Sequence, residues 1–406
     1  MILSHNLKEV KINPMFNSLV LFADIIDSSK YSSIFGLEQY ARNLVEFRRI
    51  FQKLSDEYFK YTNFNIQNID DFYFKKEVRG DEGFLVCVAP TIKDPGMLIF
   101  HAIEFSFMLK ASMEIMMRSI NGSDITPNRM KVGIGINFGP VVAMSNTETI
   151  ADKITAINRI EGYTINYAKR VESSSRIGKY SKVFISKSAN AYLFNYPVVL
   201  QKYQTNLTGI ENNEDVFEVV SVFMRSLKPN LLDHKLKEEY VIGKDIKDLE
   251  TDFINEPWLK SFILSILACM AKDSAKTYEE KKKLNEKISD LSYYKWNEND
   301  PILLFNRALL CCTKEKYTMA LNILKEIIKR YPSFIYLHKE FVKVISEMLS
   351  KEGEPLYLPI GVADMIYARD IAGDIIDNFE KVLKDESEIK KFSDFIMKVN
   401  EKLYKR

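Results

Sequence analysis

Four short segments in the first half of the chain carry polar residues whose types and spacing could do chemistry. In the first, LFADIIDSS, an apolar run ends at Asp24 and a polar stretch follows. A carboxylate at a strand end, beside the free amides that begin a helix, suits a divalent cation bound to a polyphosphate. Asp24 would hold the metal, while Asp27, Ser28 and Ser29 would receive phosphate oxygens. Asp and Ser are also ordinary helix caps, so a purely structural role stays open.

The second segment, EVRGDEG, resembles a tight hairpin centred on Gly80 and Asp81. Strand side chains alternate between faces, so Glu77, Arg79 and Asp81 should share one side until the turn perturbs them. If Asp81 lies beside Asp24, the two carboxylates could clamp two metal ions about 4 Å apart. The alternative is a solvated, charged hairpin.

The third and fourth segments are GIGINFGPVV (133–142) and GYTINYAKR (162–170). Glycines spaced as in the third predict a strand, a tight reversal and a close backbone approach. In the fourth, Asn166 and Arg170 are four residues apart and therefore on one helix face. An amide and a guanidinium there could orient a ribose and neutralise a phosphoryl group. A plain hairpin and a solvated helix face are the structural alternatives.

The elements that must position these segments alternate between strand and helix. Strand-like runs are 18–25, 81–88, 131–138 and 181–186, and helical stretches lie near 37–60, 95–120 and 163–177. The early order β, α, β, β, α, β predicts a ferredoxin-like α+β sandwich. We expect a first domain over 1–225, a linker over 226–239 and an all-α domain over 240–406.

Part of the helical half resembles a repeat. Ala308, Tyr317, Ala320 and Pro332 have the spacing of a tetratricopeptide helix pair, in which small residues let two helices approach closely. An ordinary helical bundle is the alternative. In either case this half is expected to be scaffolding.

Composition narrows the partners and the compartment. Lys and Arg number 57 and Asp and Glu 55, a net charge of +2, which gives no electrostatic reason to expect nucleic acid or a membrane. The four cysteines lack zinc or disulfide spacing. The N-terminus does not resemble a signal peptide. The most apolar later stretch, 258–271, is too short for the roughly twenty residues of a membrane span. We therefore expect a cytoplasmic protein.

Together, in this order, the four segments resemble a class III nucleotidyl cyclase catalytic domain over roughly residues 18–220. The resemblance implies that Asp24 and Asp81, with the backbone carbonyl of Ile25, bind two divalent cations, Mg²⁺ or Mn²⁺. It also implies that Asn166 and Arg170 act across a head-to-tail interface on the partner chain's metal pair. A homodimer with two shared active sites follows.

The reaction implied is attack of the ribose 3′-hydroxyl on the α-phosphate of a nucleoside triphosphate, with release of pyrophosphate. One departure from the family is the segment Leu207-Thr208-Gly209, where Thr208 replaces the usual lysine for the outer phosphates. Lys202 or Lys169 is then the candidate cation for the triphosphate tail.

In the family that this sequence resembles, two positions contact the base, and here they hold Glu77 and Arg159. Adenine-specific relatives carry a lysine and an acid there, so ATP is disfavoured. Arg79, directly before the hairpin glycine, should fill part of the base pocket and favour a smaller ring, with Tyr31 stacking or hydrogen-bonding nearby. The alternative is that Arg79 pairs with Glu77 or Asp71 and never meets a base.

This pocket resembles that of the Pycsar cyclases, antiphage enzymes that make cyclic UMP or cyclic CMP for a separately encoded effector. UTP and CTP are close alternatives: uracil's carbonyls suit Arg79, whereas cytosine's amine suits Glu77, and UTP is favoured. The alternatives are a guanylate or adenylate cyclase with a helical sensor, and a silent cyclase-like interaction module. The silent module has no physical need for both aspartates together with Asn166 and Arg170.

Overall fold

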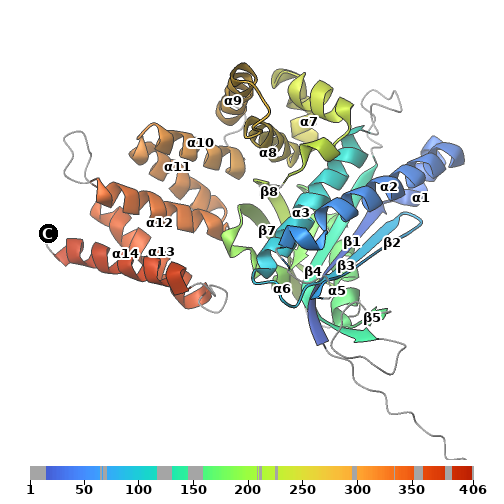
Figure 1. The fold of residues 1–406 in the computed structure, drawn as a ribbon, viewed down its shortest axis with the longest axis horizontal. Coiled ribbons are helices and arrows are strands. Elements are labelled where there is room, and N and C mark those ends of the chain that lie inside the picture. The colour runs from blue at the N-terminus through green and yellow to red at the C-terminus, as the bar shows by residue number, and fades with distance from the viewer. Residues whose placement is uncertain are drawn as a thin grey trace, which may run out of the picture.

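The computed structural model places a twisted sheet with flanking helices beside an all-helical region (Figure 1). It describes residues 15–64, 66, 71–116, 130–144, 159–207, 209, 213–224, 227–294, 300–332, 334–351, 360–379 and 386–404. The predicted fold class, α+β followed by an all-α part, is confirmed.

The sheet runs in the order β2-β3-β1-β4-β6-β8-β7, with β5 on β4. Its strands are β1 (Met15–Ile26), β2 (Tyr73–Arg79), β3 (Glu82–Val88), β4 (Lys131–Met144), β5 (Arg159–Glu161), β6 (Val183–Ser186), β7 (Val198–Asn206) and β8 (Asn213–Val222). All neighbours pair antiparallel except β4 and β6. The order β2-β3-β1-β4 is that of the predicted ferredoxin-like unit.

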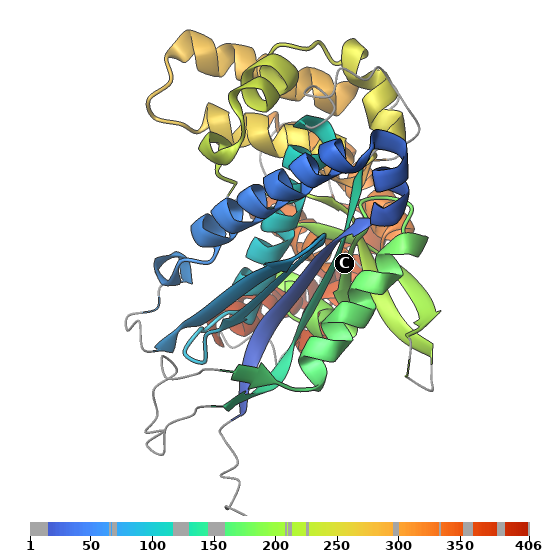
Figure 2. The same cartoon turned by 90° about the vertical axis from the view of Figure 1, so that its right-hand side faces the viewer.

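Helices cover the two faces of the sheet unequally. The helices of the first half are α1 (Ser28–Phe35), α2 (Leu37–Tyr58), α3 (Pro95–Lys110, continued by a π turn, Ala111–Met116), α5 (Tyr163–Ser173) and α6 (Lys187–Asn190). α2 and α3 lie on one face and α5 on the other (Figure 2). We call the face that carries α5 the outer face.

The alternation of β1 explains this arrangement. Leu19, Leu21 and Ile25 belong to the large core under α2 and α3, whereas Val20 and Phe22 belong to a small apolar cluster on the outer face. Because side chains two residues apart share a face, Asp24 also lies on the outer face. The first carboxylate of the predicted site therefore points away from the main core.

The glycines of the third segment seat helix α5 on strand β4. A Cβ on Gly135 would lie 2.1 Å from the amide nitrogen of Glu172, and a Cβ on Gly133 would lie 2.1 Å from Ser175 Oγ. No side chain fits at either position. The predicted close backbone approach is confirmed, and the approaching element is α5 with the 3₁₀ turn that follows it.

The predicted hairpin is also present. β2 and β3 pair in register from Tyr73 with Val88 to Arg79 with Glu82. Gly80 has a φ of +61°, the left-handed region that favours glycine, which lets the chain reverse within two residues.

The second half is helical, as predicted. Its helices are α7 (Glu250–Asn255), α8 (Leu259–Ala271), α9 (Tyr278–Tyr293), α10 (Pro301–Thr313), α11 (Tyr317–Arg330), α12 (Ile335–Ser350), α13 (Val362–Phe379) and α14 (Glu386–Tyr404). α10 and α11 form the expected helix pair, with Ala308 and Ala320 fully buried. Whether this pair is a tetratricopeptide unit stays a prediction.

The connection between the halves packs against the first. Short helical turns, Pro229–Leu231 and Lys235–Ile242, occupy most of the predicted linker. Lys228 donates to the backbone carbonyl of Glu57 in α2 at 2.6 Å, and Leu232 and Leu236 are buried. The domain boundaries at 225 and 240 stay predictions.

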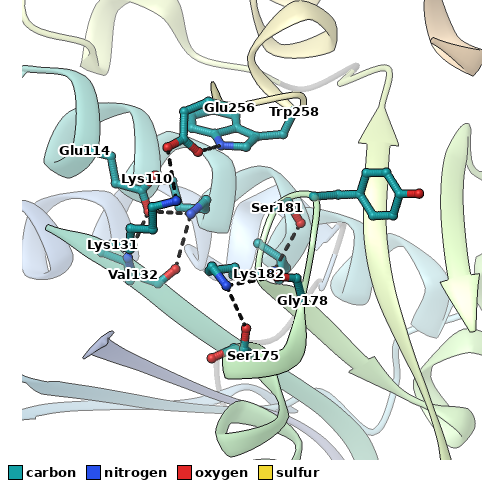
Figure 3. Close-up of polar contacts among 12 residues, drawn as sticks. Lys110, Glu114, Lys131, Val132, Ser175, Gly178, Ser181, Lys182, Glu256 and Trp258 are labelled. Carbon is teal, nitrogen blue, oxygen red and sulfur yellow. Dashed lines mark hydrogen bonds and ion pairs between the residues drawn. The ribbon is translucent and has the colours of Figure 1, made fainter. Parts of the chain in front are cut away.

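A buried polar network joins the helical half to the first residues of β4 (Figure 3). Lys110 pairs with Glu114, both side chains being only 1% exposed, and donates to the carbonyl of Val132 at 3.2 Å. Glu114 accepts from the amide of Val132 at 2.8 Å. The indole of Trp258, just before α8, lies under the Lys110 ammonium. Buried charges are costly unless they are paired, so the contacts of Lys110 and Glu114 specify this junction.

One helix in the described part of the chain, Pro95–Ile115, has the length and apolarity of a membrane span, and 94% of its apolar window is buried inside the fold. Sequence reasoning had singled out 258–271 as the most apolar later stretch. That stretch forms the shorter helix α8, which is buried against the sheet and α9.

We predict that Gly135→Ala destabilises the protein by about 1–3 kcal/mol, because the added methyl group would push α5 off β4. Gly373→Ala is the matched control, since a Cβ at Gly373 in α13 meets nothing within 4 Å. This control should be neutral or stabilising by up to about 1 kcal/mol. Denaturant unfolding measures both, and equal effects of the two variants would contradict the role of Gly135.

Candidate functional site

The end of β1 and the β2–β3 turn lie directly beside each other. Asp24 is opposite Glu82 in the β1–β3 ladder. One residue further, the amide of Ile25 donates to the carbonyl of Asp81 at 3.2 Å. The structure thus brings the two predicted metal-binding aspartates to adjoining positions.

The electrostatics of Asp24 reflect this crowding. Its side chain is 14% exposed, and burial is the main cause that raises the pKa of this carboxyl. The positive charge of Lys169 opposes the rise, while the negative charges of Asp81 and Glu82 add to it. Because burial and the nearby acids destabilise the charged form of Asp24, a cation bound beside this carboxylate would be stabilising.

The residues present fit a hard divalent cation. Amide and carbonyl of one strand residue point to the same side, so the carbonyl of Ile25 faces the Asp81 turn as its amide does. Two carboxylates and one backbone carbonyl are oxygen ligands of the kind that Mg²⁺ and Mn²⁺ prefer. In the described ranges, no three His, Cys, Asp or Glu side chains gather as a metal cluster. Substrate and water would therefore supply the other ligands.

Two cations from α5 and the turn after it lie against these acids. Lys169 pairs with Glu82 and with Glu172, at 2.9 Å from the latter. Arg176 lies 3.4 Å from Asp24 and 3.6 Å from Glu172. Sequence reasoning considered Lys169 for the triphosphate tail but missed Arg176, Glu82 and Glu172. The spacing of 169, 172 and 176, which repeats charged residues on one helix face, was the available signal.

Arg170 of the same helix points to a different side from Lys169. Asn166 is exposed and Arg170 half-buried. The Arg170 guanidinium lies beside Gly209 in the β7–β8 connection, since a Cβ there would be 3.2 Å from it. This chain's Asp24 therefore faces Lys169 and Arg176, whereas Arg170 is directed to the opposite half of the sheet. Thr208, the departure from the family pattern, lies outside the described residues.

The polar stretch after β1 opens helix α1, as expected. Asp27 is its N-cap, with a φ of +56°, and the amide of Lys30 bonds to the Asp27 carbonyl at 2.9 Å. Ser28 and Ser29 begin the helix, where backbone amides have no carbonyl one turn earlier to bond. The phosphate-binding role of this turn stays a prediction.

A cavity of about 260 Å³ opens on the outer face over β2 and β3. It is lined by Phe22, Lys75, Glu77, Arg79, Glu82, Phe84, Val86, Ile160 and Ile165. The carboxylate of Glu77 pairs with Lys75 and with Arg79, each at 2.6 Å. The predicted pairing of Arg79 with Glu77 is thus present, yet both side chains also line the cavity. An apolar floor with a charged rim suits a flat heteroaromatic ring.

Other predicted site residues lie elsewhere. Tyr31, expected near the base, is only 7% exposed in the core under α2 and α3, and burial raises its pKa to about 12. This placement does not support a base contact: Tyr31 belongs to α1, whose buried side faces Glu114. Lys202 is paired with Asp215 on the β7–β8 hairpin at 2.8 Å. Arg159 opens β5, and its side chain lies outside the described residues.

Comparison with known proteins gives structural likeness at low identity. No family model matches the sequence, and no curated protein does. Among solved structures, the chain is similar to the adenylyl cyclase CyaB from P. aeruginosa, with 17% identity over 53% of this chain and 98% of that one, at a TM-score of 0.41.

Two further solved structures are similar at the same level. The guanylyl cyclase Cya2 has 16% identity over 52% of this chain and 94% of its own, at a TM-score of 0.39. An adenylate/guanylate cyclase/hydrolase from Silicibacter pomeroyi has 14% identity over 51% and 98%, at 0.33. Each covers about half of this chain.

We predict that Arg176→Ala strengthens Mn²⁺ binding at the Asp24 site about two- to fivefold. The guanidinium competes with a metal ion for Asp24, and a half-exposed pair of this kind is worth up to about 1 kcal/mol. Titration of free Mn²⁺ by electron paramagnetic resonance measures the affinity. Arg330→Ala, which breaks an exposed pair with Glu326 on α11, is the control and should change nothing. Unchanged or weaker binding by Arg176→Ala would contradict the competition.

Proposed function

We propose that the protein is a class III nucleotidyl cyclase that converts a pyrimidine nucleoside triphosphate, UTP in preference to CTP, to its 3′,5′-cyclic monophosphate and pyrophosphate. The observation that carries the proposal is the bond from the Ile25 amide to the Asp81 carbonyl. This bond joins the Asp81 turn to the end of β1 that carries Asp24, and a cavity opens over the neighbouring strands β2 and β3.

The chain's own residues would act as follows. Asp24, Asp81 and the Ile25 carbonyl would hold two divalent cations, Mn²⁺ or Mg²⁺, and the turn at Asp27, Ser28 and Ser29 would receive phosphate oxygens. When bound, the ions would lower the pKa of the ribose hydroxyl and neutralise the triphosphate.

Asn166 and Arg170 would serve the reacting groups. The amide would fix the ribose so that its 3′-hydroxyl stays in line with the α-phosphate. The guanidinium would offset charge that develops on the α-phosphoryl oxygens as pyrophosphate leaves. Because Arg170 is directed away from its own chain's Asp24, these two residues would act on the site of a second copy. A head-to-tail homodimer with two shared sites is therefore part of the proposal.

The base-reading residues favour a pyrimidine. Arg79 lines the cavity and pairs with Glu77 on the same strand, and there its guanidinium would narrow the space that a purine ring needs. Arg159 is the further candidate base contact. By resemblance to the Pycsar cyclases, the product would be a second messenger in defence against phages, made in the cytoplasm and detected by a separately encoded effector. Neither nucleic acid nor a membrane enters this proposal.

We predict that Asp24→Asn and Asp81→Asn each lower cyclic nucleotide formation by about 10³-fold, because each removes a negative ligand of the cations that stabilise the transition state. Product is measured by mass spectrometry after incubation with UTP, CTP, GTP or ATP and Mn²⁺. Asp370→Asn on α13, which is exposed and paired with Arg369, is the control and should retain activity. Full activity in either site variant would overturn the metal assignment, and cyclic GMP or cyclic AMP as the main product would overturn the pyrimidine assignment.

We predict that mixing Asp24→Asn protein with Arg170→Ala protein restores about a quarter of wild-type activity. Half of the randomly exchanged dimers are mixed, and each mixed dimer has one intact composite site of its two. Each variant alone should be inactive. Subunit exchange is verified separately with tagged chains, and exchange without recovered activity would count against the shared site.

A further inference from the structure

The most informative unassigned residue is Lys75, which lines the cavity but is outside the motifs that the sequence revealed. We infer that Lys75 is a specificity-determining residue that, with Glu77 and Arg79, reads the Watson–Crick edge of uracil. This inference rests on the proposed cyclase function and narrows its substrate to the uridine nucleotide.

The three side chains form one row along β2. Residues 75, 77 and 79 alternate along the strand and so share its outer face. Lys75 Nζ lies 2.6 Å from Glu77 Oε1, and the Arg79 guanidinium lies 2.6 Å from Glu77 Oε2. Each carboxylate oxygen is thus flanked by a different cation, and the row presents a donor, an acceptor and a donor to the cavity.

This order of groups has one complement among the four bases. Uracil offers an acceptor, a donor and an acceptor, through O4, N3–H and O2. Cytosine offers a donor followed by two acceptors, and guanine an acceptor followed by two donors. Adenine offers a donor and one acceptor. Each of these three can satisfy at most two members of the row and leaves one of the two cations without a hydrogen bond to the base.

The row has enough hydrogen-bonding capacity to contact a base without breaking its own ion pairs. A lysine ammonium has three N–H donors and a guanidinium five, while each carboxylate oxygen has two lone pairs. One donor of each cation is used on Glu77, and the others remain for base carbonyls. The hydrogen bond from Lys75, followed by that from Arg79, also lowers the pKa of Glu77, which keeps it an acceptor.

The surroundings place a base and a triphosphate within one molecule's reach. Phe22, Phe84 and Val86 form the floor on which a ring would stack. In the ladders, Arg79 is opposite Glu82, and Glu82 is opposite Asp24. The rim of the cavity and the metal-binding carboxylate are therefore two strand spacings apart, roughly 10 Å. A ribose can bridge that distance between a base in the cavity and an α-phosphate at Asp24.

The test compares kcat/KM for UTP and CTP with Mn²⁺ in wild-type protein, Lys75→Met, Lys75→Arg and Lys76→Met. Lys75→Met should lower the UTP-to-CTP ratio about tenfold or more, the scale of one lost base contact, mainly through KM for UTP. Lys75→Arg keeps a charged donor and should restore most of the preference. Lys76→Met is the control, because Lys76 lies on the opposite face and pairs with Asp56.

The possible failures are distinct. An active wild-type enzyme that prefers CTP, or a Lys75→Met enzyme with an unchanged UTP-to-CTP ratio, would overturn this inference and leave the cyclase function standing. If Lys76→Met lowered the UTP-to-CTP ratio as well, the inference would also be overturned. The effect would then come from a disturbance of strand β2 and not from the lost Lys75 contact. A wild-type protein that makes no cyclic nucleotide from any of the four triphosphates would overturn the proposed function and this inference with it.

Discussion

Burial of acidic side chains where strand β1 ends is the constraint on which the rest of the site depends. Burial is the main cause that raises the pKa of Asp24 and of Glu172, and the negative charges of Asp81 and Glu82 add to the rise at Asp24. Carboxylates held in such a place destabilise the fold unless cations compensate. Lys169 and Arg176 supply that compensation in the chain as it stands. A divalent ion at Asp24 would do so more fully, because it brings two charges to one point.

Helix α5 can supply this compensation only because it lies unusually close to the sheet. Gly133 and Gly135 remove the side chains that would hold it off. The same close packing brings Lys169 to this chain's own acids, while Arg170 lies against Gly209 on another side of the helix and Asn166 is exposed. One helix thus balances the charges of its own site and carries two further polar groups. In the proposed head-to-tail dimer, both sets of residues would have a use.

Much of this could be predicted from the sequence because it depends on local pattern. Alternating apolar residues located the strands, and the left-handed turn at Gly80 required a glycine. The place of Arg176 beside Asp24 could not be predicted, since the two are 152 residues apart and meet only through the seat of α5. The burial of Tyr31 could not be predicted for a similar reason: nothing in the surrounding segment shows which side of α1 faces the core. Lys75 has the spacing that puts it on the same strand face as Glu77 and Arg79, but the motif identified in the sequence begins at Glu77.

The helical half contacts β4, the strand that runs beside the end of β1. Lys131 is opposite Ile26 and Gly133 is opposite Asp24, so the first three residues of β4 run along the end of β1. At the first two of these residues, Glu256 lies 3.6 Å from Lys131, and the Lys110–Glu114 pair holds both the amide and the carbonyl of Val132 (Figure 3). At the third, Gly133 packs against Ser175, next to Arg176. Packed interiors transmit displacement because they contain little free volume. The contact of Glu256 before α8 and the contact of Ser175 beside Arg176 therefore fall on neighbouring residues of one strand.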